Sequence, residues 1–129
     1  MKLILAGNSP RRKQMLSEYG YSFTAINSGF CEKQIGKSGL ETCLFFASKK
    51  AELVFNLLSD NERARSVVLG ADTLVCFNGK ILGKPKDSDD AIKTLKSLSD
   101  KSHFVFTAYA VLTSEHPTPY AFLFSVKTA

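Results

Sequence analysis

The sequence carries a long stretch with a helical apolar period, which is followed by a second, mostly apolar stretch with many β-branched residues. Between Leu40 and Leu58, apolar residues recur at alternating steps of four and three, which predicts a helix that buries one face. The positions are Leu40, Leu44, Ala47, Ala51, Val54 and Leu58. Ser38 and Glu41 have capping-box spacing at the start of this helix. Ser66–Phe77 is apolar and β-branched, which predicts a strand, and the pair favours an α/β fold.

The rest of the chain alternates strand and helix and then ends in strands. Ser9 can cap a first helix that has Pro10 at its first position, and Gly20 is placed to end it. Asn78-Gly79 predicts a hairpin. We expect strands at Leu3–Ala6, Tyr21–Ile26, His103–Thr113 and Tyr120–Thr128, and helices at Pro10–Tyr19 and from Asp87 through Ala91, Leu95 and Leu98. The 129 residues therefore predict one α/β domain, a mixed sheet with flanking helices.

The composition is that of a globular protein, with 44% hydrophobic and 22% charged residues. Its apolar runs are far shorter than the ~20 residues of a membrane-spanning helix. The first apolar run passes into Ser9-Pro10-Arg11-Arg12 too early for a signal peptide, so we expect a cytoplasmic protein. Cys31, Cys43 and Cys76 form no CxxC pair, which fits free thiols in a reducing compartment.

The net charge of +5 permits a polyanionic partner, but it does not distinguish a nucleotide from nucleic acid or from a merely basic surface. Binding to single-stranded nucleic acid needs exposed aromatic side chains beside a basic patch. Phe45, Phe46 and Phe55 instead fall on a predicted helix that is largely core. Nucleic-acid binding is therefore disfavoured.

Ser9-Pro10-Arg11-Arg12 follows the first predicted strand. A helix start presents unpaired N–H groups and the positive end of the helix dipole, which together favour an anion. Two arginines in that first turn repel the dipole unless something negative lies between them, and arginine binds phosphate in a fork geometry. This pattern predicts a phosphate site, with a solvated basic helix end as the alternative.

Asp72 interrupts the apolar Val67–Val75 segment. A carboxylate inside such a strand is costly to bury unless it has a partner or a task. Asp72 is therefore a candidate functional residue, with a structural ion pair or a water-facing position on an edge strand as alternatives.

Residues 79–85, Gly-Lys-Ile-Leu-Gly-Lys-Pro, resemble a phosphate loop only superficially, because the glycine spacing is one residue short and Pro85 replaces the required Ser or Thr. Lys84 stays a candidate, since Pro85 restricts its backbone to extended geometry. Glu32 and Lys50 are further candidates, although each taken alone suits a solvated charge. Together, the carboxylates of Glu32 and Asp72 and the cations of the preceding motifs suit a triphosphate with Mg²⁺. Mg²⁺ is typically held by one or two carboxylates and by the substrate's own phosphates. The cations are Arg11, Arg12, Lys50 and Lys84.

Three ordered motifs resemble those of the Maf family: Leu5-Ala6-Gly7-Asn8-Ser9-Pro10-Arg11-Arg12, Gly70-Ala71-Asp72-Thr73 and Gly83-Lys84-Pro85 before Asp87. The resemblance implies an ITPase-like (Maf-like) fold and a nucleoside triphosphate pyrophosphatase that uses a divalent metal, Mg²⁺ or Mn²⁺. Products are the monophosphate and pyrophosphate.

The resemblance also implies a role for each candidate. Asp72 is the proton acceptor, and with Glu32 it holds the metal that activates water. Arg12, Lys50 and Lys84 bind the substrate phosphates, and Ser9 also binds the substrate. Arg12 and Lys84 in addition stabilise the charge that develops during the reaction. Arg11 and Thr73 match positions that select the substrate, and they resemble the branch of the family that acts on dTTP and UTP.

The chain ends about two thirds of the way through the family pattern, so we expect residues 1–129 to form the amino-terminal two thirds of a Maf-like domain. The strand at 120–128 is apolar on both faces, which predicts an exposed edge, self-association or a homodimer, and little turnover. The alternative is a nucleotide-binding or regulatory module, acting in inhibition of septum formation, that lacks turnover.

Overall fold

The computed structural model describes residues 1–33, 35–77, 80–82, 88–89, 92–93, 103–116 and 118–128. Its elements are β1 (Lys2–Ala6), α1 (Pro10–Glu18), β2 (Phe23–Ile26), α2 (Gly39–Leu57), α3 (Asp60–Arg65), β3 (Ser66–Phe77), β4 (Lys80–Leu82), β5 (His103–Leu112) and β6 (Tyr120–Thr128). All five strands predicted from the sequence are confirmed, within two residues at either end. Of the helix predicted from Asp87, only residues 88–89 and 92–93 are described, and these are helical; the rest lies outside the described residues.

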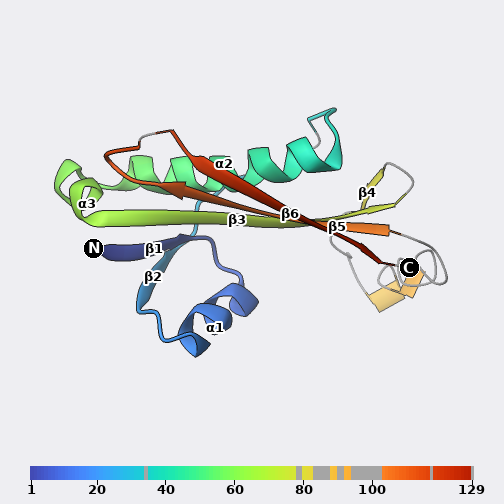
Figure 1. Cartoon of the computed structure of the whole chain (residues 1–129), viewed down its shortest axis with the longest axis horizontal. Coiled ribbons are helices and arrows are strands. Elements are labelled where there is room, and N and C mark those ends of the chain that lie inside the picture. The colour runs from blue at the N-terminus through green and yellow to red at the C-terminus, as the bar shows by residue number, and fades with distance from the viewer. Residues whose placement is uncertain are drawn as a thin grey trace.

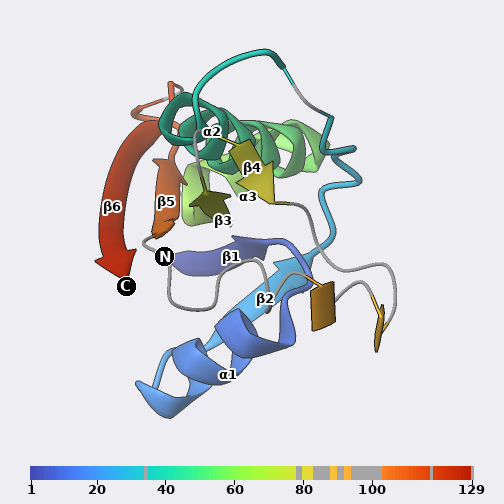
Figure 2. The same ribbon diagram turned by 90° about the vertical axis from the view of Figure 1, so that its right-hand side faces the viewer.

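The strands form one mixed sheet in the order β2-β1-β3-β5-β6, and β4 pairs with the far end of β3. β1 is parallel to both β2 and β3, whereas β5 is antiparallel to β3 and β6 is antiparallel to β5. Helices α2 and α3 lie over one face of the sheet, and α1 lies on the other side beside β1 and β2 (Figures 1 and 2). The mixed sheet with flanking helices is confirmed. Among the described residues, no helix is both long and apolar enough to cross a membrane.

Helix α1 begins and ends as the sequence predicts. The Ser9 side chain accepts a hydrogen bond from the Arg12 backbone N–H, and Pro10 occupies the first turn. Gly20, at φ +80°, takes the left-handed conformation that commonly ends a helix. None of the residues of α1 is buried, so packing holds this helix only weakly.

The buried side chains of helix α2 form most of the hydrophobic core on one face of the sheet. Ala47, Ala51, Val54 and Leu58 are buried, as the periodicity predicts. Leu40 is 41% exposed, so its predicted place on the buried face is wrong. Near its start the helix instead turns Cys43 and Phe46 toward the sheet, so the buried face is rotated relative to the predicted stripe.

The contact between α2 and β3 is exceptionally close at Gly70. A Cβ atom there would lie 2.2 Å from the Ala47 carbonyl oxygen and 2.9 Å from the Ala51 nitrogen. Both neighbours are backbone atoms of α2, so they cannot rotate away. Lys50, which lies between them in the sequence, is thereby held beside the part of β3 that follows Gly70.

β3 has an open edge just beyond this contact. β1 pairs with β3 from Ser66 to Gly70, and β4 pairs with it only from Val75 onward. On that side, residues 71–74 have no strand neighbour among the described residues. The gap lies at the carboxyl ends of β1 and β2, where α/β sheets characteristically bind ligands.

We predict that Gly70→Ala destabilises the protein, because the new methyl group must push α2 away from β3. Overpacking of this kind costs typically ~1–3 kcal/mol. Urea unfolding would measure the loss, with Gly7→Ala as the control, since a Cβ at Gly7 would meet nothing within 4 Å. Equal stabilities for the two variants would contradict the close contact.

Candidate functional site

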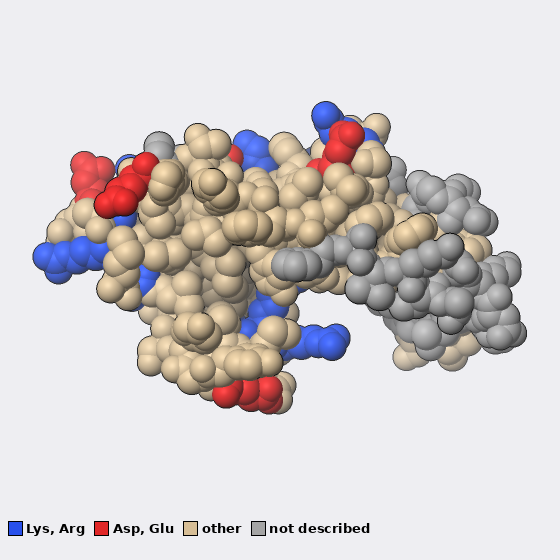
Figure 3. All heavy atoms as spheres, viewed as in Figure 1, with Lys and Arg blue, Asp and Glu red and all other residues tan. Residues whose placement is uncertain are grey.

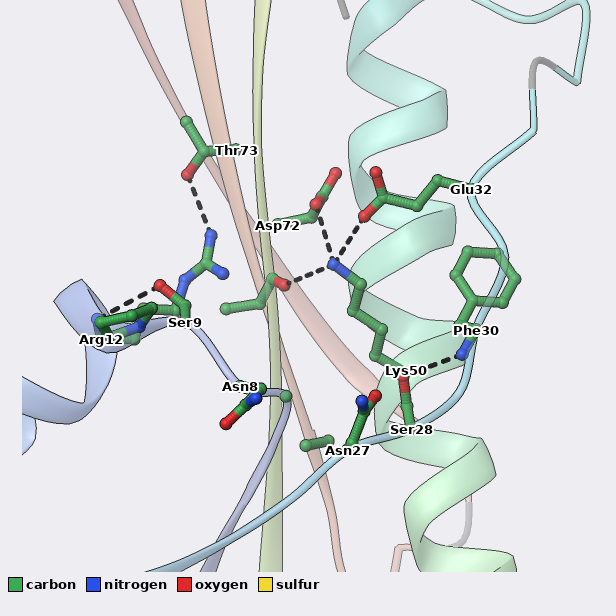
Figure 4. Close-up of a pocket in the computed structure, with 14 residues that line it drawn as sticks. Asn8, Ser9, Arg12, Asn27, Ser28, Phe30, Glu32, Lys50, Asp72 and Thr73 are labelled. Carbon is green, nitrogen blue, oxygen red and sulfur yellow. Dashed lines mark hydrogen bonds and ion pairs between the residues drawn. The ribbon is translucent and has the colours of Figure 1, made fainter. Parts of the chain in front are cut away.

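A pocket of about 640 Å³ lies at the open edge of β3. It is bordered by the turn after β1, the start of α1, the segment after β2, the middle of α2 and the open part of β3 (Figure 4). In the space-filling view, α1 and its neighbours project from the sheet, and basic side chains gather in the hollow beside them (Figure 3). Six predicted site residues line this pocket: Ser9, Arg12, Glu32, Lys50, Asp72 and Thr73.

On the α2 side of the pocket, one ammonium group bridges two carboxylates. Lys50 Nζ lies 2.7 Å from Glu32 Oε1 and 3.0 Å from Asp72 Oδ1. The side chains of Asp72, Lys50 and Glu32 are 6%, 14% and 30% exposed, so the charges become more covered toward β3. The predicted alternative of a water-facing Asp72 on an edge strand is wrong, because β3 is an interior strand and Asp72 is buried.

Burial raises the pKa of Asp72, and the nearby Glu32 carboxylate raises it further, whereas the Lys50 ammonium lowers it. The net shift is upward, so desolvation and the Glu32 carboxylate together outweigh the ion pair with Lys50. Asp72 Oδ2 is covered, and it has no hydrogen-bond partner in the described part of the chain. A buried carboxylate with one unused oxygen is a group available to a cation or to a proton.

The thiol of Cys43, on α2, makes a hydrogen bond to the backbone of Asp72. Its Sγ lies 3.3 Å from the Asp72 carbonyl oxygen and donates to it, and burial raises the pKa of the thiol to about 12. A thiol that is protonated at neutral pH is a weak nucleophile, so Cys43 has a structural role. All three cysteines are free, as the sequence predicts.

On the α1 side of the pocket, Arg12 contacts β3. Its Nη2 donates to Thr73 Oγ1 at 3.2 Å. Successive side chains of a strand point to opposite faces, so Asp72 faces α2 while Thr73 faces the side of α1. The open edge of β3 joins these two halves into one pocket, with the carboxylates on one side and the guanidinium on the other (Figure 4).

The two neighbouring arginines take different places. Arg11 does not line the larger pocket but borders a second one of about 370 Å³, together with Met15, Val105 and Tyr109. Arg12 and Thr73 border both pockets, so they form the boundary between them. Lys84, predicted to bind phosphate, lies outside the described residues.

Sequence reasoning missed Asn8, Asn27, Ser28 and Phe30, which also line the larger pocket. The first three follow the carboxyl ends of β1 and β2, and because these strands are parallel their ends meet at one edge. Polar residues directly after two neighbouring strands were the available signal. No sequence signal pointed to Phe30, because its position depends on packing against Phe45 and Phe46. The centroid of its ring lies 6.3 Å from that of Phe45 and 5.4 Å from that of Phe46.

The pair Glu32 and Asp72 suits a hard divalent cation. Carboxylate oxygens are the ligands that Mg²⁺ prefers, and one or two of them suffice when substrate phosphates complete the shell. Among the described residues, no group of three or more His, Cys, Asp or Glu gathers as a self-sufficient metal cluster. Lys50 Nζ already lies between the two carboxylates, so a cation there would compete with it.

Comparison of the sequence with known proteins identifies relatives of this chain. A dTTP/UTP pyrophosphatase of Colwellia psychrerythraea is 43% identical over 113 residues, which cover 87% of this chain and 53% of that protein. Proteins of the same name from Bdellovibrio bacteriovorus and Aquifex aeolicus are 44% and 43% identical, over 59% and 58% of their lengths. The chain therefore spans a little over half the length of these relatives.

Among solved structures, the Staphylococcus aureus Ham1 protein has a similar fold. The TM-score is 0.64 at 14% sequence identity, covering 98% of this chain and 70% of that one. This likeness confirms the predicted ITPase-like fold. Residues 2–128 match the family model described as Maf-like protein. With that match along nearly its whole length, the chain belongs to the Maf-like protein family.

Proposed function

We propose that this chain binds a nucleoside triphosphate in the larger pocket and hydrolyses it to the monophosphate and pyrophosphate. The observation that carries the proposal is the buried Asp72 carboxylate, with one unpartnered oxygen, facing the same pocket as the Arg12 guanidinium. The names of the relatives support dTTP and UTP as substrates.

The phosphates bind between the two halves of the pocket. Arg12 approaches from the α1 side, and the positive end of the α1 dipole adds to the positive potential. Lys50 approaches from α2, and Lys84 is proposed as a third cation on the strength of the family motif. Arg12 and Lys84 stabilise the charge that develops on the phosphoryl oxygens, and stabilisation of this kind usually supplies most of the rate enhancement in such reactions.

Asp72 accepts a proton from the attacking water. The water oxygen bonds to the α-phosphorus, the bond from that phosphorus to the bridging oxygen breaks, and pyrophosphate leaves with the electron pair. Lys50 pairs with Oδ1 of Asp72 and Oδ2 is covered, so we expect Lys50 to move from Asp72 toward the phosphates when substrate binds, which frees a carboxylate oxygen for the water. Glu32 and Asp72 would hold a Mg²⁺ or Mn²⁺ ion, which neutralises phosphate charge and makes water more acidic when bound.

The direct test is product analysis with a panel of nucleoside triphosphates in the presence of Mg²⁺ or Mn²⁺. We expect pyrophosphate and the monophosphate to form in equal amounts, with dTTP and UTP as the best substrates. Release of inorganic phosphate with the diphosphate would contradict attack at the α-phosphorus. Saturable binding without any product would contradict turnover by this chain.

We predict that Asp72→Asn lowers kcat by ~10² to 10⁴, the usual cost of losing a general base. The substitution keeps the shape of the side chain, so the steady-state assay of this variant measures the loss of the proton acceptor. A variant that keeps near-normal kcat would remove Asp72 from the chemistry.

A thermal control tests whether the Asp72→Asn variant is folded. Because the pKa of Asp72 is raised in the folded protein, its carboxyl group contributes stability below the ordinary value of 3.8 and loses that contribution as the pH rises. At pH 7 with EDTA, the variant should therefore unfold at a temperature no lower than the parent protein. The advantage should shrink as the pH falls toward the ordinary value.

We predict different consequences for the two arginines. Arg12 borders the larger pocket, so Arg12→Ala should lower kcat/KM by about 10- to 100-fold on every triphosphate, the scale of a lost charged hydrogen bond. Arg11 borders only the second pocket, so Arg11→Ala should change the ranking of bases. Kinetics on the same panel would show this, and equal, base-independent losses from both variants would contradict the division.

A further inference from the structure

The Arg12 guanidinium is held by a neutral group. Within the described residues it makes one side-chain hydrogen bond, to Thr73 Oγ1 at 3.2 Å, and no ion pair. A carboxylate partner would hold the side chain more firmly but would also offset its charge. The hydroxyl leaves the full positive charge of Arg12 to the pocket.

Helix α1 does not fix Arg12 by packing, because none of its residues is buried. The direction of the guanidinium must therefore come from its contact with the sheet. A single hydroxyl is a weak guide by itself, since a threonine still has more than one χ1 rotamer and nothing in the bond to Arg12 selects between them. The group that restrains Thr73 thus decides where Arg12 points.

Thr107 on β5 supplies that restraint. Its Oγ1 lies 3.2 Å from Thr73 Oγ1, and the two residues are directly opposite in the antiparallel β3–β5 pair. A guanidinium only donates, so Thr73 accepts from Arg12, and its hydroxyl keeps both a proton and a second lone pair for a bond with Thr107, in which either oxygen can donate. Where Thr73 is the donor, accepting a bond from a cation makes its hydroxyl a better donor and strengthens the second bond.

We propose that Thr107 is a positioning residue for phosphate binding, which acts through Thr73 to aim Arg12 into the larger pocket. The chain Arg12–Thr73–Thr107 ties a weakly packed helix to two interior strands of the sheet. Opposed threonines suit this task, because β-branched side chains have few χ1 rotamers and cross-strand partners lie close together. The proposal deepens the proposed function, since it rests on Arg12 binding phosphate.

The test uses binding of inorganic tripolyphosphate to the whole chain, measured by calorimetry. This probe has no base, so an effect of Thr107 on base contacts in the second pocket, which Thr107 also borders, does not enter the measurement. Thr107→Val keeps the shape of the side chain and removes the hydroxyl, and it should weaken binding about 3- to 10-fold, the scale of one hydrogen bond. Thr107→Ser restores the hydroxyl and should return binding to within about twofold of the parent.

A double-mutant cycle separates positioning from a structural effect. In the Arg12→Ala background, Thr107→Val should have no further effect on binding, because the group that it aims is gone. Undiminished weakening in that background, failure of Thr107→Ser to rescue, or parent-level binding by Thr107→Val would each overturn the proposal. So would a parent protein that does not bind tripolyphosphate. Arg12-dependent binding without hydrolysis of any triphosphate would instead contradict the proposed function alone and leave the role of Thr107 standing.

Discussion

The bridge from the Lys50 ammonium to the Asp72 and Glu32 carboxylates is the interaction on which the site depends. Two carboxylates that share a partly buried position repel each other, and burial adds a desolvation cost for each charge. Lys50 offsets both, and it reaches them because α2 lies directly on β3 at Gly70. The raised pKa of Asp72 shows that the compensation is incomplete, so the site retains an affinity for a proton or another cation.

The strand geometry explains how one short motif serves both halves of the pocket. Asp72 and Thr73 are consecutive, so they point to opposite faces of β3, toward α2 and toward the side of α1. On most strands these faces are separated by the neighbouring strand. Here β1 has ended and β4 has not begun, so a ligand at the open edge can contact both. The gap between two strands therefore turns a local sequence motif into a two-sided site.

Much of the fold could be predicted because its signals are local: the cap at Ser9, the apolar strand containing Asp72 and the periodicity of α2 all follow from neighbouring residues. The grouping of Arg12, Lys50 and Asp72 required the family resemblance, since it depends on which strands pair. The contacts of Phe30 and Thr107 could not be predicted. They depend on how α2 packs and on the register of β3 against β5, which side-chain patterns do not specify.

The most direct test of this account is a crystal structure of the chain with a dTTP analogue that carries a non-hydrolysable α,β-imido link, in the presence of Mg²⁺. The account predicts phosphates in the larger pocket, bound by Arg12 and Lys50, with the Lys50 ammonium moved from Asp72 to a phosphate oxygen. Asp72 should then face the α-phosphorus. Phosphates bound elsewhere, or bound in this pocket while Lys50 still bridges both carboxylates, would contradict it.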